Sequence, residues 1–158
     1  LGYAWDSADG QVARLRGGGS VAGEWLDHFV DAIKISTLHI AVLIGLARFT
    51  DLPQAALLLP LAYSVVASVT FFGMILNDLL KGARGVASTA SRGGASAGRS
   101  ILLLPTDYGV LCLVFVFWGW TAAFWWLYGV LFALNALFLL AASVKWFREM
   151  KAITPHAG

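Results

Sequence analysis

Long uncharged apolar stretches predict membrane-spanning helices in this chain. About 20 mostly apolar residues are needed to cross the hydrocarbon core of a bilayer. Residues 53–76 carry no charge and fit that length, and residues 108–144 form an uncharged run of 37, long enough for two crossings. We expect a tight turn near Gly119–Thr121 to divide this run. Residues 24–47 form a further segment that is apolar only in its second half. Its first half carries four charged side chains: Glu24, Asp27, Asp31 and Lys34.

The pattern predicts an all-α polytopic membrane protein, a helical bundle with four full crossings. Composition supports this fold class: of 158 residues, 59% are hydrophobic and 13% are charged, whereas a soluble domain is about 25% charged. We interpret residues 1–158 as a single membrane-embedded domain. Because the chain starts without Met, we expect it to be truncated at the N-terminus. The single cysteine, Cys112, lies in an apolar run and gives no signal of compartment.

Basic residues predict the orientation of the bundle, because cytosolic loops carry an excess of Lys and Arg. They are concentrated in three segments, which we place in the cytosol: residues 1–24, 80–106 and 145–158. The opposite side offers only Arg48, beside Asp51. Residues 82–100 are rich in Gly, Ala and Ser, so we interpret residues 80–106 as a flexible cytosolic connection.

Two sets of residues near the start of the chain are spaced to share a helical face. On a helix, residues three, four and seven apart lie on one side. The first set combines two carboxylates with two small residues: Asp6, Asp9, Gly10 and Ala13. The second set repeats every four residues: Gly23, Asp27 and Asp31. The glycine-rich stretch Leu15–Ala22 predicts a hairpin between two facing helices.

The four aspartates predict a metal site. Carboxylates converging on one cavity repel one another unless cations neutralise them, and oxygen ligands suit hard ions such as Mg²⁺ or Mn²⁺. A pair of such ions is the usual clamp for displacement at phosphorus. Arg14 lies beside the first face, where its guanidinium can neutralise phosphate oxygens. For any single aspartate, an ordinary surface acid is the better interpretation, but it does not explain the joint spacing.

In this order and spacing, the residues resemble a known family. Eight fixed positions match over 26 residues: Asp6, Asp9, Gly10, Ala13, Arg14, Gly23, Asp27 and Asp31. This is the motif of the CDP-alcohol phosphotransferase (CDP-alcohol phosphatidyltransferase) family, class I. The resemblance implies a bundle of six transmembrane helices, usually a homodimer, with the motif on the second and third helices. This chain would then hold the end of the second helix and the third to sixth.

The resemblance also implies a role for each motif residue. Four carboxylates would hold two Mg²⁺ or Mn²⁺ ions: Asp6, Asp9, Asp27 and Asp31. Asp31 would also be the general base that deprotonates the acceptor alcohol. The remaining positions would bind the cytidine nucleotide: Gly10, Ala13, Arg14 and Gly23. The acceptor oxygen would then attack the phosphorus that bears the donor alcohol and expel CMP, as in phospholipid biosynthesis.

Family resemblance favours CDP-diacylglycerol as the donor, while the residues leave a soluble CDP-alcohol and any of several acceptor alcohols open. We expect membrane lipid as a partner, no nucleic acid, and a place in a bacterial cell membrane with the site on the cytosolic side. Three alternatives remain: an intramembrane Mg-dependent prenyltransferase, a non-catalytic cation-binding or transport protein, and an inactive gene product. The prenyltransferase would not need the small residues, and its aspartate motifs usually lie several helices apart.

Polar residues outside the motif have simpler interpretations. Lys34 shares the helical face of Asp27, so it could neutralise an aspartate or contact an acceptor phosphate. His39 and Asn135 lie deeper and are expected to make polar contacts within the bundle. Three residues at the predicted membrane edges are expected to be helix ends or caps: Asn77, Asp78 and Asp107.

Overall fold

The computed structural model of the chain describes residues 20–86 and 107–153, and these contain helices and turns but no strand. The elements in chain order are α2 (Val21–Phe49), η1 (Gln54–Leu57), α3 (Leu58–Gly82), α5 (Tyr108–Val114), η3 (Phe115–Phe117) and α6 (Thr121–Ile153). The prediction of an all-α helical bundle is confirmed.

Three of the helical segments are long and apolar enough to cross a membrane: Val21–Phe49, Gln54–Gly82 and Thr121–Ile153. At about 1.5 Å per residue, even the shortest exceeds a hydrocarbon core of about 30 Å. The predicted crossing from residue 108 is shorter in the described part of the chain, where α5 has seven residues and η3 three. This apolar helix spans about 15 Å, or half of the core.

Local sequence explains where the helices begin and end. Ser20 caps α2, because its hydroxyl accepts a hydrogen bond of 3.0 Å from the Gly23 N–H. After α3, Gly85 has a φ of +66°, and Val86 N–H donates to the Lys81 carbonyl at 3.0 Å. This glycine-dependent closure satisfies carbonyls at the helix end. The predicted turn is confirmed, since η3 ends at Phe117 and α6 begins at Thr121.

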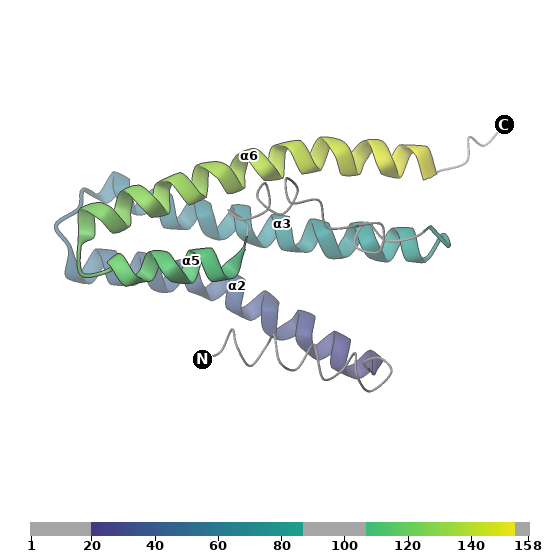
Figure 1. The fold of residues 1–158 in the computed structure, drawn as a ribbon, viewed down its shortest axis with the longest axis horizontal. Coiled ribbons are helices and arrows are strands. Elements are labelled where there is room, and N and C mark those ends of the chain that lie inside the picture. Colours follow the sequence, from purple (N-terminus) through teal and green to yellow (C-terminus); the bar gives the residue numbers. More distant parts are fainter. Residues whose placement is uncertain (1–19, 87–106, 154–158) are drawn as a thin grey trace.

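α2 runs antiparallel to both α3 and α6, so the start of α2 and the ends of α3 and α6 lie at one end of the bundle (Figure 1). His28 of α2 lies edge-on to Phe71 of α3, with ring centroids 6.4 Å apart. We call this the basic end, because five basic residues lie on the last turns of α3 and α6 or just after α3: Lys81, Arg84, Lys145, Arg148 and Lys151. The fold thus places at one end of the bundle the described parts of the three segments that the basic residues had assigned to the cytosolic side of the membrane.

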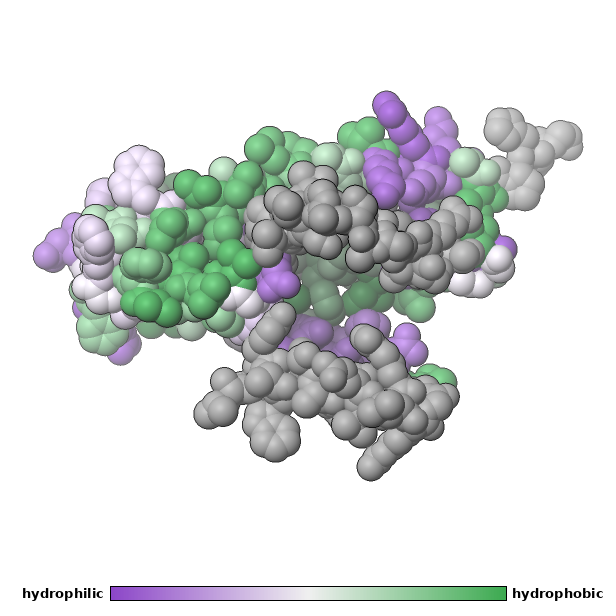
Figure 2. Space-filling view, viewed as in Figure 1, coloured by the Kyte–Doolittle hydropathy of each residue, from purple (hydrophilic) through white to green (hydrophobic). Residues whose placement is uncertain are grey.

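The apolar core lies in the other half of the bundle, near the two short connections. It joins the end of α2, the start of α3, α5 and the start of α6: Val42, Leu46, Tyr63, Leu111, Val114, Phe124, Tyr128 and Leu131. Figure 2 shows hydrophobic surface over the middle of the bundle and hydrophilic residues near the end of α6. Large apolar side chains on the outside, such as Phe72 and Leu137, fit a molecule whose solvent is lipid.

Buried polar side chains connect three helices within this core. His39 Nδ1 lies 2.6 Å from the Tyr128 hydroxyl, and the His39 ring stacks on Tyr63 with centroids 4.0 Å apart. Asn135 donates from Nδ2 to the Tyr63 hydroxyl at 2.9 Å. The interpretation of His39 and Asn135 as polar contacts within the bundle is therefore confirmed.

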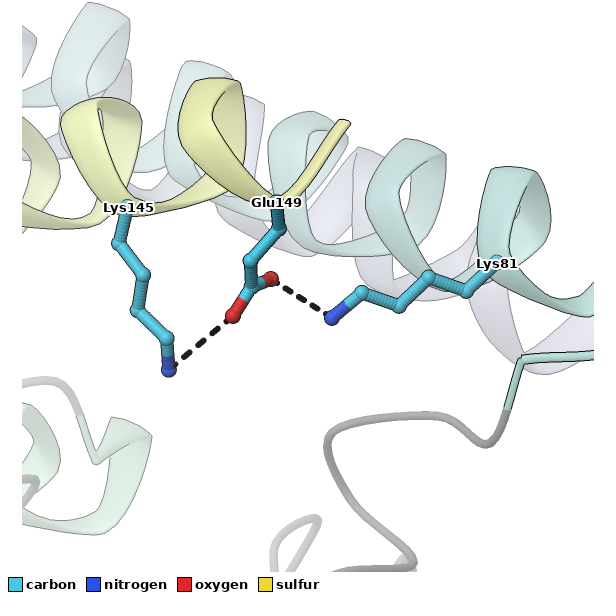
Figure 3. A network of polar contacts seen from close by, with 3 residues as sticks. All are labelled: Lys81, Lys145 and Glu149. Atoms are coloured by element: carbon cyan, nitrogen blue, oxygen red, sulfur yellow. Dashed lines mark hydrogen bonds and ion pairs between the residues drawn. The ribbon is translucent and has the colours of Figure 1, made fainter. Parts of the chain in front are cut away.

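An ion-pair cluster joins α3 and α6 at the basic end (Figure 3). Lys81 Nζ lies 2.7 Å from Glu149 Oε2, and Lys145 Nζ lies 3.8 Å from Glu149 Oε1. Lys81 is only 5% exposed, although the sequence had suggested a basic residue at the start of a cytosolic connection. Its burial is tolerated because Glu149 supplies the opposite charge that a buried ammonium needs.

Candidate functional site on α2

The structure places one half of the motif on a single uninterrupted helix. Gly23, Asp27 and Asp31 lie on α2, and their spacing of four residues puts them on one face. The other half lies outside the described residues: Asp6, Asp9, Gly10, Ala13 and Arg14. The described part of the site is therefore the acidic face of α2, which we define by Gly23, Asp27 and Asp31.

Gly23 lies in the first turn of α2, beside the Ser20 cap. A Cβ at this position would lie 3.3 Å from the Ser20 hydroxyl oxygen, closer than most real contacts of this kind. The glycine thus suits the capping geometry whether or not a ligand lies nearby. On its outer side the residue is exposed, so the face beside the cap is open.

Asp27 and Asp31 differ in their surroundings. Asp27 is exposed and lies one turn after Gly23 on α2. The side chain of Asp31 is 28% exposed, and its Oδ1 lies 2.7 Å from Nζ of Lys34. The structure thus supports the interpretation in which Lys34 neutralises an aspartate of the motif, and identifies that aspartate as Asp31.

Tyr108 completes this group from a different element. Its ring centroid lies 5.7 Å from the Lys34 ammonium, so the face of an aromatic ring on α5 meets a cation on α2. Asp107 caps α5 by accepting a hydrogen bond from Gly109 N–H at 2.6 Å, as predicted, and so fixes the helix start at Tyr108. Sequence reasoning missed Tyr108, because the contact joins residues 74 positions apart and has no local pattern.

The described residues fit a cation site in their donor chemistry. Asp27 and Asp31 offer hard oxygen atoms one turn apart, and Asp31 already pairs with the positive charge of Lys34. Within residues 20–86 and 107–153, no three His, Cys, Asp or Glu side chains converge. Two of the four predicted carboxylates, Asp6 and Asp9, lie outside these ranges.

One of the predicted helix-end residues, Asn77, has a different role from the one expected. Asn77 and Asp78 lie inside the last turns of α3, before its end at Gly82. Asn77 is 5% exposed, and its side chain hydrogen-bonds Glu149. Oδ1 of each residue is buried without a hydrogen-bond partner among the described residues. Asn77 therefore belongs to the ion-pair cluster of α3 and α6 and is not a cap.

A comparison with protein families shows to which family the chain belongs. The model of one family, CDP-alcohol phosphatidyltransferase, matches residues 1–146. The chain belongs to this family. The match includes all eight motif positions and every described helix except the last turns of α6, so the resemblance noted from the motif is confirmed. A search of curated proteins found no significant match, and a search of solved structures found none either.

Membership of the CDP-alcohol phosphatidyltransferase family gives the chain its general class. It is an integral membrane protein, since the family is a membrane enzyme family and three of the helices are long and apolar enough to span a bilayer. It belongs to a family of transferases that act on CDP-alcohols.

Proposed function

We propose that this protein transfers a phospho-alcohol group from a CDP-alcohol to an acceptor hydroxyl and releases CMP, in phospholipid biosynthesis. The family match over residues 1–146 carries this proposal. The acidic face of α2 supports it, because Asp27 and Asp31 lie on one open helical face next to the basic end of the bundle.

Each described residue has a proposed task. Asp31 accepts the proton of the acceptor hydroxyl, whose oxygen then attacks the phosphorus bearing the donor alcohol. The same carboxylate, with Asp6, Asp9 and Asp27, holds two divalent cations. When bound, Mg²⁺ or Mn²⁺ supplies charge stabilisation for the entering and leaving oxygens. Gly23 leaves space for the nucleotide beside the helix start, together with Gly10, Ala13 and Arg14.

The surroundings of the site suggest its partners and its side of the membrane. The basic end fits the cytosolic side, where Lys and Arg accumulate. We propose CDP-diacylglycerol as the donor, because a site at the membrane edge can receive a lipid headgroup from the bilayer. A bacterial cell membrane as location and a homodimer as assembly complete the proposal, together with one membrane-embedded domain spanning residues 1–158.

Replacement of the proposed base tests the function directly. We expect Mg²⁺-dependent release of CMP from CDP-diacylglycerol by the full-length protein in nanodiscs, with a panel of candidate acceptor alcohols. Asp31→Asn keeps the shape of the side chain but cannot accept the proton, so the rate should fall by about 10²–10⁴-fold. Asp51→Asn is the matched control, since Asp51 is exposed in the connection between α2 and η1 at the other end of the bundle.

Two further measurements separate the remaining alternatives. A prenyltransferase would release pyrophosphate from a prenyl diphosphate and no CMP, and a transport protein in sealed vesicles would move cations across the membrane without a product. Full CMP release by Asp31→Asn would exclude Asp31 as the base. No release with any donor and acceptor would contradict the proposed function itself.

A further inference from the structure

Lys34 and Tyr108 form a contact that the proposed reaction does not require. Lys34 lies one turn after Asp31 on α2 and pairs with its Oδ1 at 2.7 Å. The ring of Tyr108, on α5, has its centroid 5.7 Å from the same Nζ atom. Tyr108 is the first residue of α5, directly after the Asp107 cap. The cation thus contacts both a motif carboxylate and an aromatic face.

The surroundings of this pair distinguish it from an ordinary surface ion pair. The side chains of Lys34 and Asp31 are 36% and 28% exposed, so solvent reaches both only in part. A charge pair that is partly withdrawn from water, near a low-dielectric membrane, interacts more strongly than the same pair in bulk water. The aromatic ring adds a second attraction for the ammonium, which comes from a different helix.

We propose that Lys34 is an internal counter-ion of Asp31 that competes with divalent cations for this carboxylate, and that Tyr108 positions it. The inference rests on the proposed function, which makes Asp31 a metal ligand. A divalent cation that uses Oδ1 must displace Lys34 from it and also experiences repulsion from its positive charge. Lys34 and Tyr108 therefore raise the concentration of divalent cation that is required to fill the site.

Binding of Mn²⁺ alone tests the proposal without any turnover. We would titrate the full-length protein in nanodiscs with Mn²⁺ and follow the free ion by electron paramagnetic resonance. Lys34→Gln removes the competing charge at a few ångströms, so Mn²⁺ should bind about tenfold more tightly. Lys34→Arg keeps the charge and should retain an affinity close to that of the wild type.

Further variants separate positioning from a general loss of structure. Tyr108→Leu removes the ring and should tighten Mn²⁺ binding by about threefold, because a less firmly held ammonium competes less. Tyr108→Phe keeps the ring and should leave the affinity unchanged. In an Asp31→Asn background, Lys34→Gln should tighten binding by less than in the wild type, because competition for the carboxylate is gone and only the repulsion between charges remains. Lys145→Gln is the matched control, since it removes a lysine from an ion pair on α6 that does not involve Asp31.

The outcomes distinguish this inference from the proposed function. Equal or weaker Mn²⁺ binding by Lys34→Gln, alongside normal CMP release by the wild type, would overturn the counter-ion role and leave the function standing. Tighter binding by Lys34→Gln without any CMP release by the wild type would support the counter-ion role and contradict the function. If the wild type and all variants fail to bind Mn²⁺, both proposals are wrong.

Discussion

Single glycines set how closely the helices of this bundle approach one another. A Cβ at Gly73 of α3 would lie 2.6 Å from Cζ3 of Trp146 on α6, and a Cβ at Gly45 of α2 would lie 2.8 Å from the Trp118 ring. In both places an indole ring occupies the space of the absent side chain. This close packing matters in a bilayer, where association between helices depends on van der Waals contact and not on exclusion of water.

Substitution of Gly73 by alanine should therefore destabilise the bundle. The added methyl group displaces the Trp146 ring from α3, and overpacking of this kind costs about 1–3 kcal/mol. Thermal unfolding in detergent would show a lower midpoint. Gly129→Ala is the matched control on α6, because its nearest neighbour, Leu59 Cδ2, would be at an ordinary 3.7 Å. A Gly73→Ala variant as stable as the wild type would contradict the role assigned to Trp146.

At single residues, the sequence predicted helix caps and the need for a polar partner well, but it did not predict which residues on other helices would be the partners. Capping by Asp107 was predictable because a cap is local, and a partner for Asn135 was predictable because an amide in a membrane needs one. The identity of that partner, Tyr63, was not predictable, since it lies on a different helix. The same reason explains why neither Tyr108 nor the burial of Lys81 was foreseen.

At the scale of helices, hydrogen bonds in the core hold α2, α3 and α6 in register. His39 of α2 pairs with Tyr128 of α6, while Asn135 of α6 pairs with Tyr63 of α3. Each bond fixes the position of one helix relative to another along the bundle axis. Because apolar helices can slide past one another in lipid at little cost, polar pairs of this kind specify how α2, α3 and α6 are aligned.

The coupling between His39 and Tyr128 can be measured with a double-mutant cycle. We expect Tyr128→Phe and His39→Leu each to reduce stability, and the double variant to lose less than the sum. The coupling energy should be about 0.6–1.7 kcal/mol, the range found for hydrogen bonds between membrane helices. Unfolding by a denaturing detergent would supply the four free energies. If the two substitutions change the free energy of unfolding additively, the 2.6 Å contact between His39 and Tyr128 does not contribute to stability.

Helix positions were easier to predict than helix lengths. The uncharged runs at residues 53–76 and 108–144 located α3, the turn before α6 and most of α6, but α3 continues to Gly82 and α6 to Ile153. Charged side chains did not end these helices, because Lys81 and Glu149 pair with each other across the interface. A hydropathy pattern cannot detect this compensation, since it treats each charge alone.

For the whole molecule, the core and the candidate site occupy opposite halves. The buried apolar side chains of the core cluster near the two short connections, whereas Gly23 and Asp27 are exposed at the basic end. Stability and the proposed chemistry therefore depend on different parts of the bundle. The sequence predicted this separation of core and candidate site only in part. The motif locates the acidic residues, but it does not indicate which apolar residues become buried.

The sidedness of the bundle can be tested by cysteine labelling in intact cells. In a Cys112→Ser background, a membrane-impermeant maleimide should label Asp51→Cys from outside and Arg84→Cys only after permeabilisation. The two positions flank Gln54–Gly82, which is long enough to cross the membrane. Labelling of both from one side would contradict a crossing by α3. The reverse pattern would contradict the cytosolic position of the basic end.

The pairing of Lys81 with Glu149 has a consequence for the assembly of the protein. The two residues are 68 positions apart, and at about 5–20 residues per second the ribosome needs roughly 3–14 s to make the intervening chain. During that interval Glu149 has not yet been made, so the positive charge of Lys81 can help retain the end of α3 at one surface of the membrane. Once α6 enters the bilayer, Glu149 neutralises this lysine. One side chain thus acts first as a topological signal during insertion and later as an interhelical contact in the folded protein.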